Sequence, residues 1–222
     1  MEIKLANICK AFDGRIVLHN VNLTLAPGEI TCLMGPSGIG KTTLVNILAG
    51  LLKADGGEIS GLNGLRVSAV FQEDRLLEWE TALRNVEFVT RKRGTGDGSA
   101  VLRCAQDTEP SPCPTQLLTQ AGLGSHLHKK AAELSGGMKR RVCICRALAA
   151  EYDILLLDEP FKGLDDGTKT MIMNMVKKHI RPGAYVLCVT HDVSEVEILG
   201  GRLISLNRKI RSSEIQNENS PL

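Results

Sequence analysis

The apolar residues Ile3, Leu5 and Ile8 have polar neighbours, and residues 21–25 alternate between apolar and polar with a period of two. This period is typical of strands that bury one face. Short apolar runs follow at residues 30–34, 58–59, 66–71, 154–157 and 184–189. The last two runs are unbroken, as expected for parallel strands that are buried on both faces. The pattern therefore predicts β structure at the start of the chain and a buried sheet beyond it.

Helix-forming stretches lie between these runs, at residues 43–49, 138–150, 168–180 and 194–199, and a last strand is expected at residues 202–206. Gly50 ends the first of these helices, and Pro182 with Gly183 ends the third. Strands that alternate with helices predict an α/β fold. We expect a mainly parallel sheet with flanking helices, preceded by antiparallel strands at the N-terminus.

The sequence pattern changes after residue 72, where predicted helical segments are separated by polar loops at residues 94–99 and 108–114. A helical subdomain is therefore expected to be inserted into the core. The expected division is a first part of the core at residues 1–72, the helical subdomain at 73–150, a second part of the core at 151–211 and a frayed polar tail at 212–222.

The loop that follows residues 30–34 is rich in glycine and ends in Lys-Thr-Thr. Its spacing fits a P-loop, in which backbone N–H groups and the positive end of the next helix surround a phosphate. Lys41 is expected to reach the terminal phosphates, and the Thr42 hydroxyl to ligate Mg²⁺. The residues of this expected nucleotide site are Gly35, Pro36, Ser37, Gly38, Ile39, Gly40, Lys41, Thr42 and Thr43. A plain glycine-rich turn is the alternative, but the strand before and the helix after it favour a nucleoside triphosphate site.

Two carboxylates, Asp158 and Glu159, follow the apolar run at residues 154–157. They are expected at the carboxyl end of a core strand, which is the edge of an open α/β sheet where ligands bind. Phosphoryl transfer needs one carboxylate to hold Mg²⁺ and a second to polarise the attacking water. A solvated junction between strand and loop is the alternative, but the P-loop upstream favours the catalytic interpretation.

Composition restricts the classes of protein that fit the chain. Its 222 residues are 43% hydrophobic, enough for one domain with an insertion. Basic and acidic residues nearly balance, 27 against 25, and aromatic residues make up only 3%, which argues against a nucleic-acid partner. No apolar stretch reaches the roughly 18 residues of a membrane span, and the N-terminus lacks a secretory signal. We expect a soluble, intracellular protein that can still dock on a membrane component.

The chain has seven cysteines, an odd number, and a disulfide framework is not expected. Cys143 and Cys145 invite a metal-binding interpretation, but positions two apart do not share a helix face, and no second pair has ligand spacing. We expect both to be buried as small apolar side chains. The basic run of Lys139, Arg140 and Arg141 is expected on a solvated helix face rather than at a phosphate.

The chain resembles an ATP-binding cassette ATPase, the motor subunit of membrane transporters, over nearly its whole length. The motifs that carry the resemblance, in order, are the P-loop, Gln72, Leu134-Ser135-Gly136-Gly137-Met138, residues 154–160, Gly163-Leu164-Asp165 and His191. The Ser-Gly-Gly signature about twenty residues before an Asp-Glu strand end separates this family from other P-loop proteins. The resemblance implies a P-loop NTPase fold and ATP hydrolysis.

The signature is a second candidate anion site. Ser135, Gly136 and Gly137 open a helix, so a hydroxyl, exposed N–H groups and a positive dipole end converge on one point. One ATP does not need two distant phosphate-binding sites, the P-loop and the signature, in the same chain. The resemblance implies that two chains meet head to tail as a homodimer, each signature closing over the γ-phosphate on the partner's P-loop. A plain helix N-cap, the alternative, accounts for Ser135 but not for two glycines.

The resemblance also implies roles at the site. Gln72 would contact Mg²⁺ and the attacking water, and Thr42 and Asp158 would be the other metal ligands. Glu159 resembles the general base of the family. His191 would hold the γ-phosphate and orient the water. ATP and Mg²⁺ are thus the expected cofactors.

Other positions are implied at the edges of the site or depart from the family. Phe12 would stack on adenine, although a lone Phe near a strand end is more often part of a core. Asp165 would lie at the dimer seam. Met138 stands where glutamine is commonest in the signature, so a polar contact near the partner's nucleotide is missing. Lys162 stands where the family often has a small residue.

Residues 71–79 look like a stretch typical of the nitrate, sulfonate and taurine importer branch, with Glu78 in place of the usual proline. The resemblance implies an ATPase subunit at the cytoplasmic face of the membrane. It would engage permease subunits beside Gln72 and work with a separate substrate-binding protein. A soluble cassette ATPase acting on DNA or the ribosome is the alternative, but the tandem cassettes, coiled coil or basic arm expected there are not found in the sequence. An exporter is a further alternative, although exporter cassettes are commonly fused to membrane domains.

Overall fold

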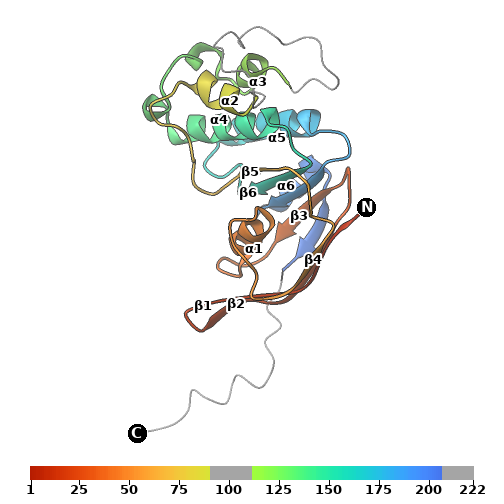
Figure 1. Ribbon diagram of the computed structural model, residues 1–222. Helices are drawn as coiled ribbons and strands as arrows, with labels where there is room; N and C mark the ends of the chain where they lie inside the picture. The colour runs from red at the N-terminus through yellow and green to blue at the C-terminus, as the bar shows by residue number, and fades with distance from the viewer. Residues whose placement is uncertain (91–111, 207–222) are drawn as a thin grey trace.

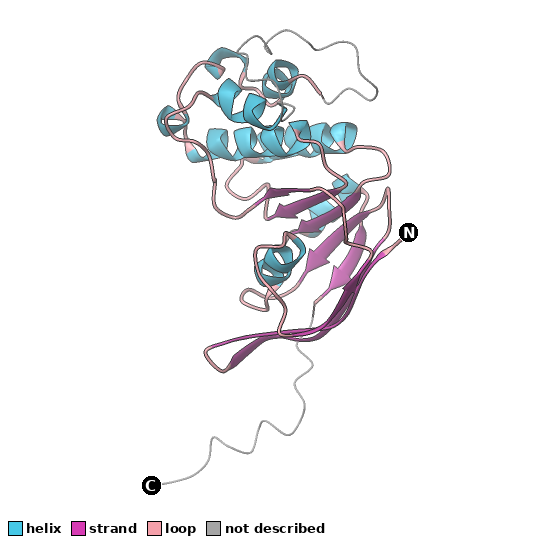
Figure 2. Cartoon of the chain, in the orientation of Figure 1, coloured by secondary structure: helices cyan, strands magenta, loops and turns pink. Residues whose placement is uncertain are grey.

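The computed structural model describes residues 1–90 and 112–206 (Figure 1). The loop expected at residues 94–99, the first part of the loop expected at 108–114, and the tail at 212–222 lie outside the described residues. Figure 2 shows two regions, a lower one that contains all the labelled strands of Figure 1 and an upper one made of helices.

The central sheet is wholly parallel and has the strand order β5-β6-β7-β3-β8. Its strands are β3 (Ile30–Met34), β5 (Val67–Val70), β6 (Ile154–Asp158), β7 (Tyr185–Val189) and β8 (Arg202–Ser205). Every residue of β6 and β7 is buried, as the unbroken apolar runs predict. Since parallel strands end at the same edge, the carboxyl ends of β3, β6 and β7 lie side by side there.

A second, antiparallel sheet has the order β2-β1-β4. It contains β1 (Ile3–Phe12), β2 (Arg15–Leu25) and β4 (Gly56–Ser60). The hairpin between β1 and β2 turns at Asp13 and Gly14, both with positive φ (48° and 78°), which is the requirement of a type I′ turn. The prediction of antiparallel strands at the N-terminus is confirmed.

Helix α1 (Lys41–Leu48) lies between the two sheets (Figure 1). Its apolar side chains, with Leu44 and Leu48 fully buried, join one core cluster with residues of β1, β2 and one face of the parallel sheet. The other face of the sheet packs on α4 (Gly136–Ala149) and α5 (Asp166–His179). The layers on both faces of the sheet therefore fix the strand ends from which the candidate site projects.

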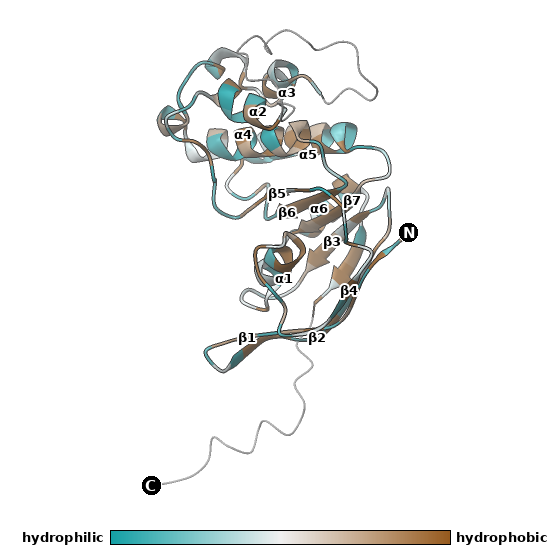
Figure 3. Cartoon of the chain, viewed as in Figure 1, coloured by the Kyte–Doolittle hydropathy of each residue, from teal (hydrophilic) through white to brown (hydrophobic). Residues whose placement is uncertain are grey.

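The helical region contains α2 (Ala82–Thr90), α3 (Pro114–Gln120) and α4, with short 3₁₀ turns at Gly124–His126 and Ala131–Glu133. The hydropathy colouring of Figure 3 shows polar and apolar segments mixed along these helices, whereas the strands of the parallel sheet are mostly apolar. Pro114 was expected in a loop but is the first residue of α3, where its missing N–H is harmless. Last, α6 (Val193–Leu199) joins β7 to β8.

Helix starts are the main difference between the expected and observed elements. Helix α1 begins at Lys41 rather than residue 43, and α4 begins at Gly136 rather than 138. Helix α4 opens with two glycines of low helix propensity and is held by the Ser135 cap, whereas α1 opens at Lys41 without a side-chain cap. The expectation for the basic run was wrong at Arg140, which is buried against the loop that carries Gln72.

Candidate active site

The P-loop connects β3 to α1. Gly40 is the N-cap of α1 at φ 104°, and no side chain caps the helix, so its first N–H groups can bond an anion. A Cβ at Gly40 would lie 2.5 Å from Leu18 Cδ2, so only glycine fits. Gly38 also has positive φ, at 76°. These two glycines give the loop the shape that a phosphate requires.

The side chain of Lys41 folds back over this loop. Its ammonium donates to the carbonyl oxygens of Gly35 at 2.8 Å and Pro36 at 2.9 Å, and the residue is only 6% exposed. Burial lowers the pKa of Lys41, while the nearby negative charges of Glu159 and Asp158 counteract part of that change. A phosphate would therefore meet a cation that is already placed at the loop.

Asp158 ends β6 and is 1% exposed. Neither of its carboxylate oxygens has a well-formed hydrogen bond within the described part of the chain. Burial raises the pKa of Asp158, and the neighbouring Thr42 hydroxyl counteracts part of the rise. A buried carboxylate without a partner is costly, and it fits a divalent cation that Thr42 could share.

Glu159 follows at φ 47°, an uncommon conformation for a residue other than glycine. Its Oε1 lies 2.7 Å from His191 Nε2, and its Oε2 accepts from Lys162 Nζ at 2.8 Å. Burial alone would raise the pKa of Glu159, but its bonds to Lys162 and His191 and their charges lower it below its ordinary value. The structure thus keeps this carboxylate ionised, the state in which it can accept a proton.

The loop that carries His191 is fixed by an ionic network. Lys169 of α5 pairs with Asp192 at 2.6 Å and with Glu195 at 2.7 Å. Glu195 is buried and accepts from the Thr190 hydroxyl at 2.5 Å. Burial alone would lower the pKa of Lys169, but its two carboxylate partners raise it. His191 thus lies between two residues that are held from α5 and α6.

Most of these groups line a cavity of about 560 Å³, within the usual range for small-molecule sites, but the buried Asp158, an expected metal ligand, does not line it. The expected residues that line it are Ser37, Gly38, Gly40, Lys41, Thr42, Thr43, Gln72, Glu159 and His191. Lining residues that were not assigned to the site from sequence are Val17, Lys162, Thr190, Asp192 and Glu195. Lys162, Thr190 and Asp192 lie beside motif residues, and this is the signal in the sequence that could have found them. Val17 has no such signal, because it belongs to β2.

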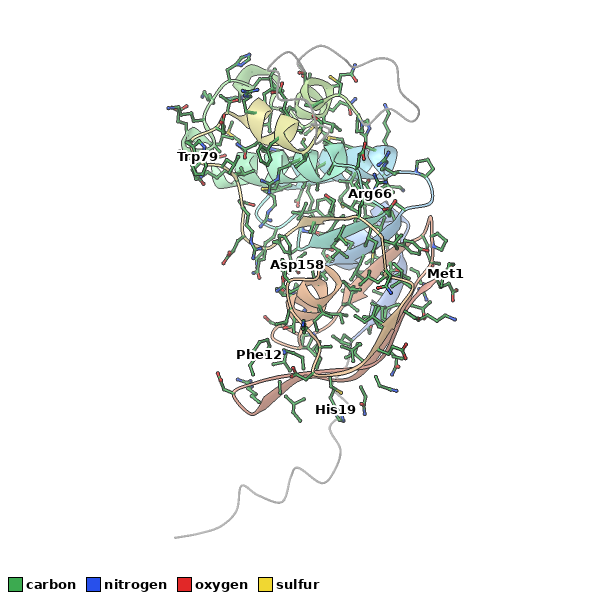
Figure 4. All side chains as sticks on the ribbon, in the orientation of Figure 1. Met1, Phe12, His19, Arg66, Trp79 and Asp158 are labelled. Atoms are coloured by element: carbon green, nitrogen blue, oxygen red, sulfur yellow. The ribbon has the colours of Figure 1, made fainter. Side chains whose placement is uncertain are left out.

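Some of the expected site residues do not line the cavity. Phe12 does not line the cavity. It lies at the end of β1 (Figure 4) and is 44% exposed, so it is not part of a core. The Lys10 Nζ atom lies 5.5 Å from the centre of its ring. Gly35, Pro36 and Ile39 shape the P-loop without lining the cavity. The signature does not line it either.

The signature opens α4 as a well-formed cap. Ser135 Oγ accepts from the Met138 N–H at 3.3 Å. Gly136 is exposed, and a Cβ there would contact nothing within 4 Å. A Cβ at Gly137 would meet Leu164 at 3.5 Å, an ordinary contact. Packing within the described residues therefore does not require a glycine at either position.

Cys143 and Cys145 are buried in α4, as expected for small apolar side chains. Burial raises the pKa of the Cys143 thiol to about 12 and raises that of Cys145 as well. Neither is therefore a thiolate near neutral pH. No helix within residues 1–90 and 112–206 has both the length and the apolar character that crossing a bilayer requires.

Comparison with known proteins gives consistent matches. The family model for the ABC transporter matches residues 18–162. The aliphatic sulfonates import ATP-binding protein SsuB 2 of Burkholderia cenocepacia (strain HI2424) is 38% identical over 89% of this chain and 70% of that protein. The protein of the same name from Pseudomonas syringae pv. syringae (strain B728a) is 40% identical over 92% of this chain and 69% of that protein.

Two solved structures of the ATP-binding cassette MJ0796 are also similar. A dimer in a post-hydrolysis state bound to ADP and Pi matches with a TM-score of 0.77 and 34% identity, over 92% of this chain and 94% of that chain. Another dimeric structure matches with a TM-score of 0.74 and 32% identity, with the same coverage of both chains. Relatives named as import proteins do not favour the alternative of a cassette that acts on DNA or the ribosome.

The resemblance to the sulfonate branch that residues 71–79 carry is confirmed by the relatives, and the P-loop NTPase fold by the solved cassettes. The match over residues 18–162 includes the P-loop, Gln72, the signature and Glu159. Because model, relatives and solved cassettes agree, this chain belongs to the ABC transporter family as one of its ATP-binding ATPases.

Proposed function

We propose that this chain hydrolyses ATP to drive the import of a small anion, with sulfonates as the best-supported class and nitrate-like or taurine-like compounds beside them. The observation that carries the hydrolytic part is the position of Glu159. Its ionised carboxylate, bonded to His191, lies in the P-loop cavity next to the buried, unpartnered Asp158. The substrate class follows from the relatives, which are named for aliphatic sulfonates import.

The metal site would be formed by Asp158 and Thr42, with Gln72 completing it from the other side of the cavity. A Mg²⁺ ion held there would neutralise part of the negative charge of the phosphates. The P-loop N–H groups and Lys41 would bind the β- and γ-phosphates. Thr43, Ser37 and the remaining P-loop residues keep these donors in place.

In the reaction, water attacks the γ-phosphorus of ATP and the bond to the β-phosphate oxygen breaks, which gives ADP and phosphate. Glu159 would accept the proton of the attacking water, since its carboxylate is ionised and faces the cavity. His191 would hold Glu159 in place and bond the γ-phosphate. The αL backbone of Glu159, with φ 47°, is uncommon outside glycine and is consistent with a positioned base.

The second clamp would come from another copy of the chain. Ser135, Gly136 and Gly137 would close over the γ-phosphate held by the partner, with Asp165 at the seam and Phe12 against adenine. The free space at Gly136 supports this arrangement, as do the two dimeric cassettes. ATP binding would close the dimer, and hydrolysis would reopen it.

The partner in the membrane would be a permease that docks on the helical region. Trp79, seven residues after Gln72, and Phe88 of α2 support this placement, since they are 70% and 66% exposed. The chain would then act at the cytoplasmic face of the membrane, and a separate substrate-binding protein would deliver the transported anion.

Replacement of Glu159 by Gln tests the hydrolytic role. Glu159→Gln is expected to bind ATP, to lose turnover by about a hundredfold or more, and to accumulate as an ATP-stabilised dimer. Phosphate release and gel filtration with ATP measure these effects. Glu197→Gln, which neutralises an exposed carboxylate of α6, is the control and should behave as the parent. Hydrolysis by Glu159→Gln at the parental rate would show that another group is the base.

A further inference from the structure

The segment that carries Gln72 has no helix or strand of its own. It runs from Phe71 to Trp79, between the end of β5 and the start of α2, and we call it the Gln72 segment. Several of its backbone groups bond to side chains of neighbouring helices. From α2, Asn85 accepts from the Leu77 N–H at 2.8 Å and donates to the Leu77 carbonyl at 3.1 Å.

From α4, Arg140 holds the start of the Gln72 segment. Its Nη1 donates to the Phe71 carbonyl at 2.6 Å, and its Nη2 donates to the Gln72 carbonyl at 2.5 Å. Nη1 also lies 3.2 Å from Asp74 Oδ1. Arg140 is 7% exposed, and the rigid fork of a guanidinium suits two successive carbonyls. The position of Gln72 is therefore tied to one side chain of α4.

The same helix holds the rest of the segment. Arg146 Nη1 donates to the Arg75 carbonyl at 2.6 Å. Lys139 Nζ donates to both carboxylate oxygens of Glu78, at 3.0 and 3.1 Å. Within the described residues, α4 thus contacts the Gln72 segment at its start, its middle and near its end.

Helix α4 also carries the signature, because Ser135 is its N-cap. Arg140 comes five residues later, which is about 7 Å along a helix axis. A single helix of this length moves as a rigid element. We propose that Arg140 is a positioning residue that ties the signature to the Gln72 segment, so that Gln72 moves with the signature when ATP binds. This inference depends on the proposed function for the role of Gln72.

The chain contains a reporter for this movement. Trp79 is the single tryptophan of the sequence and ends the Gln72 segment. It is 70% exposed, and Figure 4 shows it at the edge of the helical region, far from Asp158. A change of its emission on ATP binding therefore reports a change of the segment rather than direct contact with nucleotide in the cavity.

The test replaces Arg140 by Met, which keeps the length of the side chain but removes every donor. Steady-state ATPase assays should show kcat lowered about tenfold, as expected when a group at the reaction is misplaced, and KM for ATP within about twofold of the parent. In the Glu159→Gln background, ATP should change Trp79 emission. In the double variant with Arg140→Met, ATP should bind with the same Kd but leave Trp79 emission unchanged.

Two further variants separate positioning from stability. Ser68→Ala removes a buried 3.0 Å bond from the Ser68 hydroxyl to the Ala147 carbonyl, which joins β5 to α4 without touching Gln72. It should lower the unfolding temperature but leave kcat unchanged. Arg140→Lys keeps the charge beside Asp74 but replaces the rigid planar fork, whose two nitrogens each reach one carbonyl, by a single nitrogen on a flexible stem, so kcat should stay lowered at least about threefold.

Three results would overturn the inference. Two are kinetic: full recovery of kcat in Arg140→Lys, or parental kcat in Arg140→Met. The third is spectroscopic: ATP either leaves Trp79 emission unchanged in Glu159→Gln, or changes it equally with and without Arg140. Failure of the proposed function would look different, because the parent itself would then not hydrolyse ATP or Glu159→Gln would retain turnover.

Discussion

Both oxygens of the Glu159 carboxylate are engaged. Oε1 contacts His191 and Oε2 accepts from Lys162. The contact with His191 belongs to the proposed site, whereas the side chain of Lys162 is 61% exposed. A base must have an oxygen free for the attacking water. Lys162 therefore restrains the residue that we propose as the base.

Lys162→Ala is expected to raise kcat by up to about fivefold, because exposed ion pairs contribute up to about 1 kcal/mol and this energy would no longer oppose the reaction. KM for ATP should change less. The control is Lys178→Ala, which removes an exposed lysine of α5. A decrease of kcat would instead indicate that Lys162 binds the phosphates of ATP.

Single residues differ in how well the sequence predicts them. Lys41 and Asp158 follow from motif spacing alone, because a P-loop and a strand end with two carboxylates have few other uses. Arg140 could not be placed, since a basic run on a helix is usually solvated and its partners are backbone carbonyls, which leave no mark in a sequence. Phe12 was assigned by resemblance, and the structure places it outside the residues that line the cavity.

At the scale of elements, α5 and α6 support the His191 loop through charges. Lys169 on α5 contacts Asp192 and Glu195 at the start of α6. The bond from Lys169, with those from Ser194, lowers the pKa of Asp192 from 3.8 to about 2. Because this pKa is lower in the folded state, ionised Asp192 stabilises the fold above about pH 4, and the contribution is lost as the pH falls toward 2.

Lys169→Met should therefore lower the free energy of unfolding by about 2 kcal/mol near neutral pH, since it leaves the buried Glu195 carboxylate without its cation. The difference from the parent should shrink between about pH 4 and pH 2. Denaturant unfolding at several pH values measures both effects.

The matched control for Lys169→Met is Lys177→Met, which removes a bond from α5 to the Ile198 carbonyl of α6 without involving a carboxylate. Its effect should not depend on pH between 7 and 2. A difference between Lys169→Met and the parent that stays constant over this range would contradict the assignment to Asp192.

Elements were predicted best where periodicity is strong. The strands β6 and β7 and the helices α5 and α6 were expected within two residues of their observed limits. Helix starts are expected too late at Lys41 and Gly136, because the glycine-rich P-loop runs directly into α1 and because α4 opens with two glycines behind the Ser135 cap. The antiparallel pairing of β1 with both β2 and β4 includes register shifts that no local pattern encodes.

At the scale of the whole molecule, the described residues contain two helix starts that we propose to bind anions, and the two do not line the same cavity. The P-loop lines the cavity and the signature does not. A single sequence cannot show which molecule meets the signature; resemblance to dimeric cassettes and the open space at Gly136 both indicate a second copy. The proposed head-to-tail dimer accounts for both helix starts with one nucleotide each.

Gly136→Asp tests this dimer, because it places a negative charge where the partner's γ-phosphate would approach. Gly136 has free space around it, so the variant should fold and bind ATP through its own P-loop. In the Glu159→Gln background, ATP should shift the parent to dimer in gel filtration, whereas the variant with Gly136→Asp should remain monomeric, since like charges repel in a desolvated site. Asn63→Asp in the same background adds an equal charge at an exposed turn and should still dimerise. A dimer that forms equally well with Asp at position 136 would mean that the signature does not contact the partner's nucleotide, and the second clamp would need another explanation.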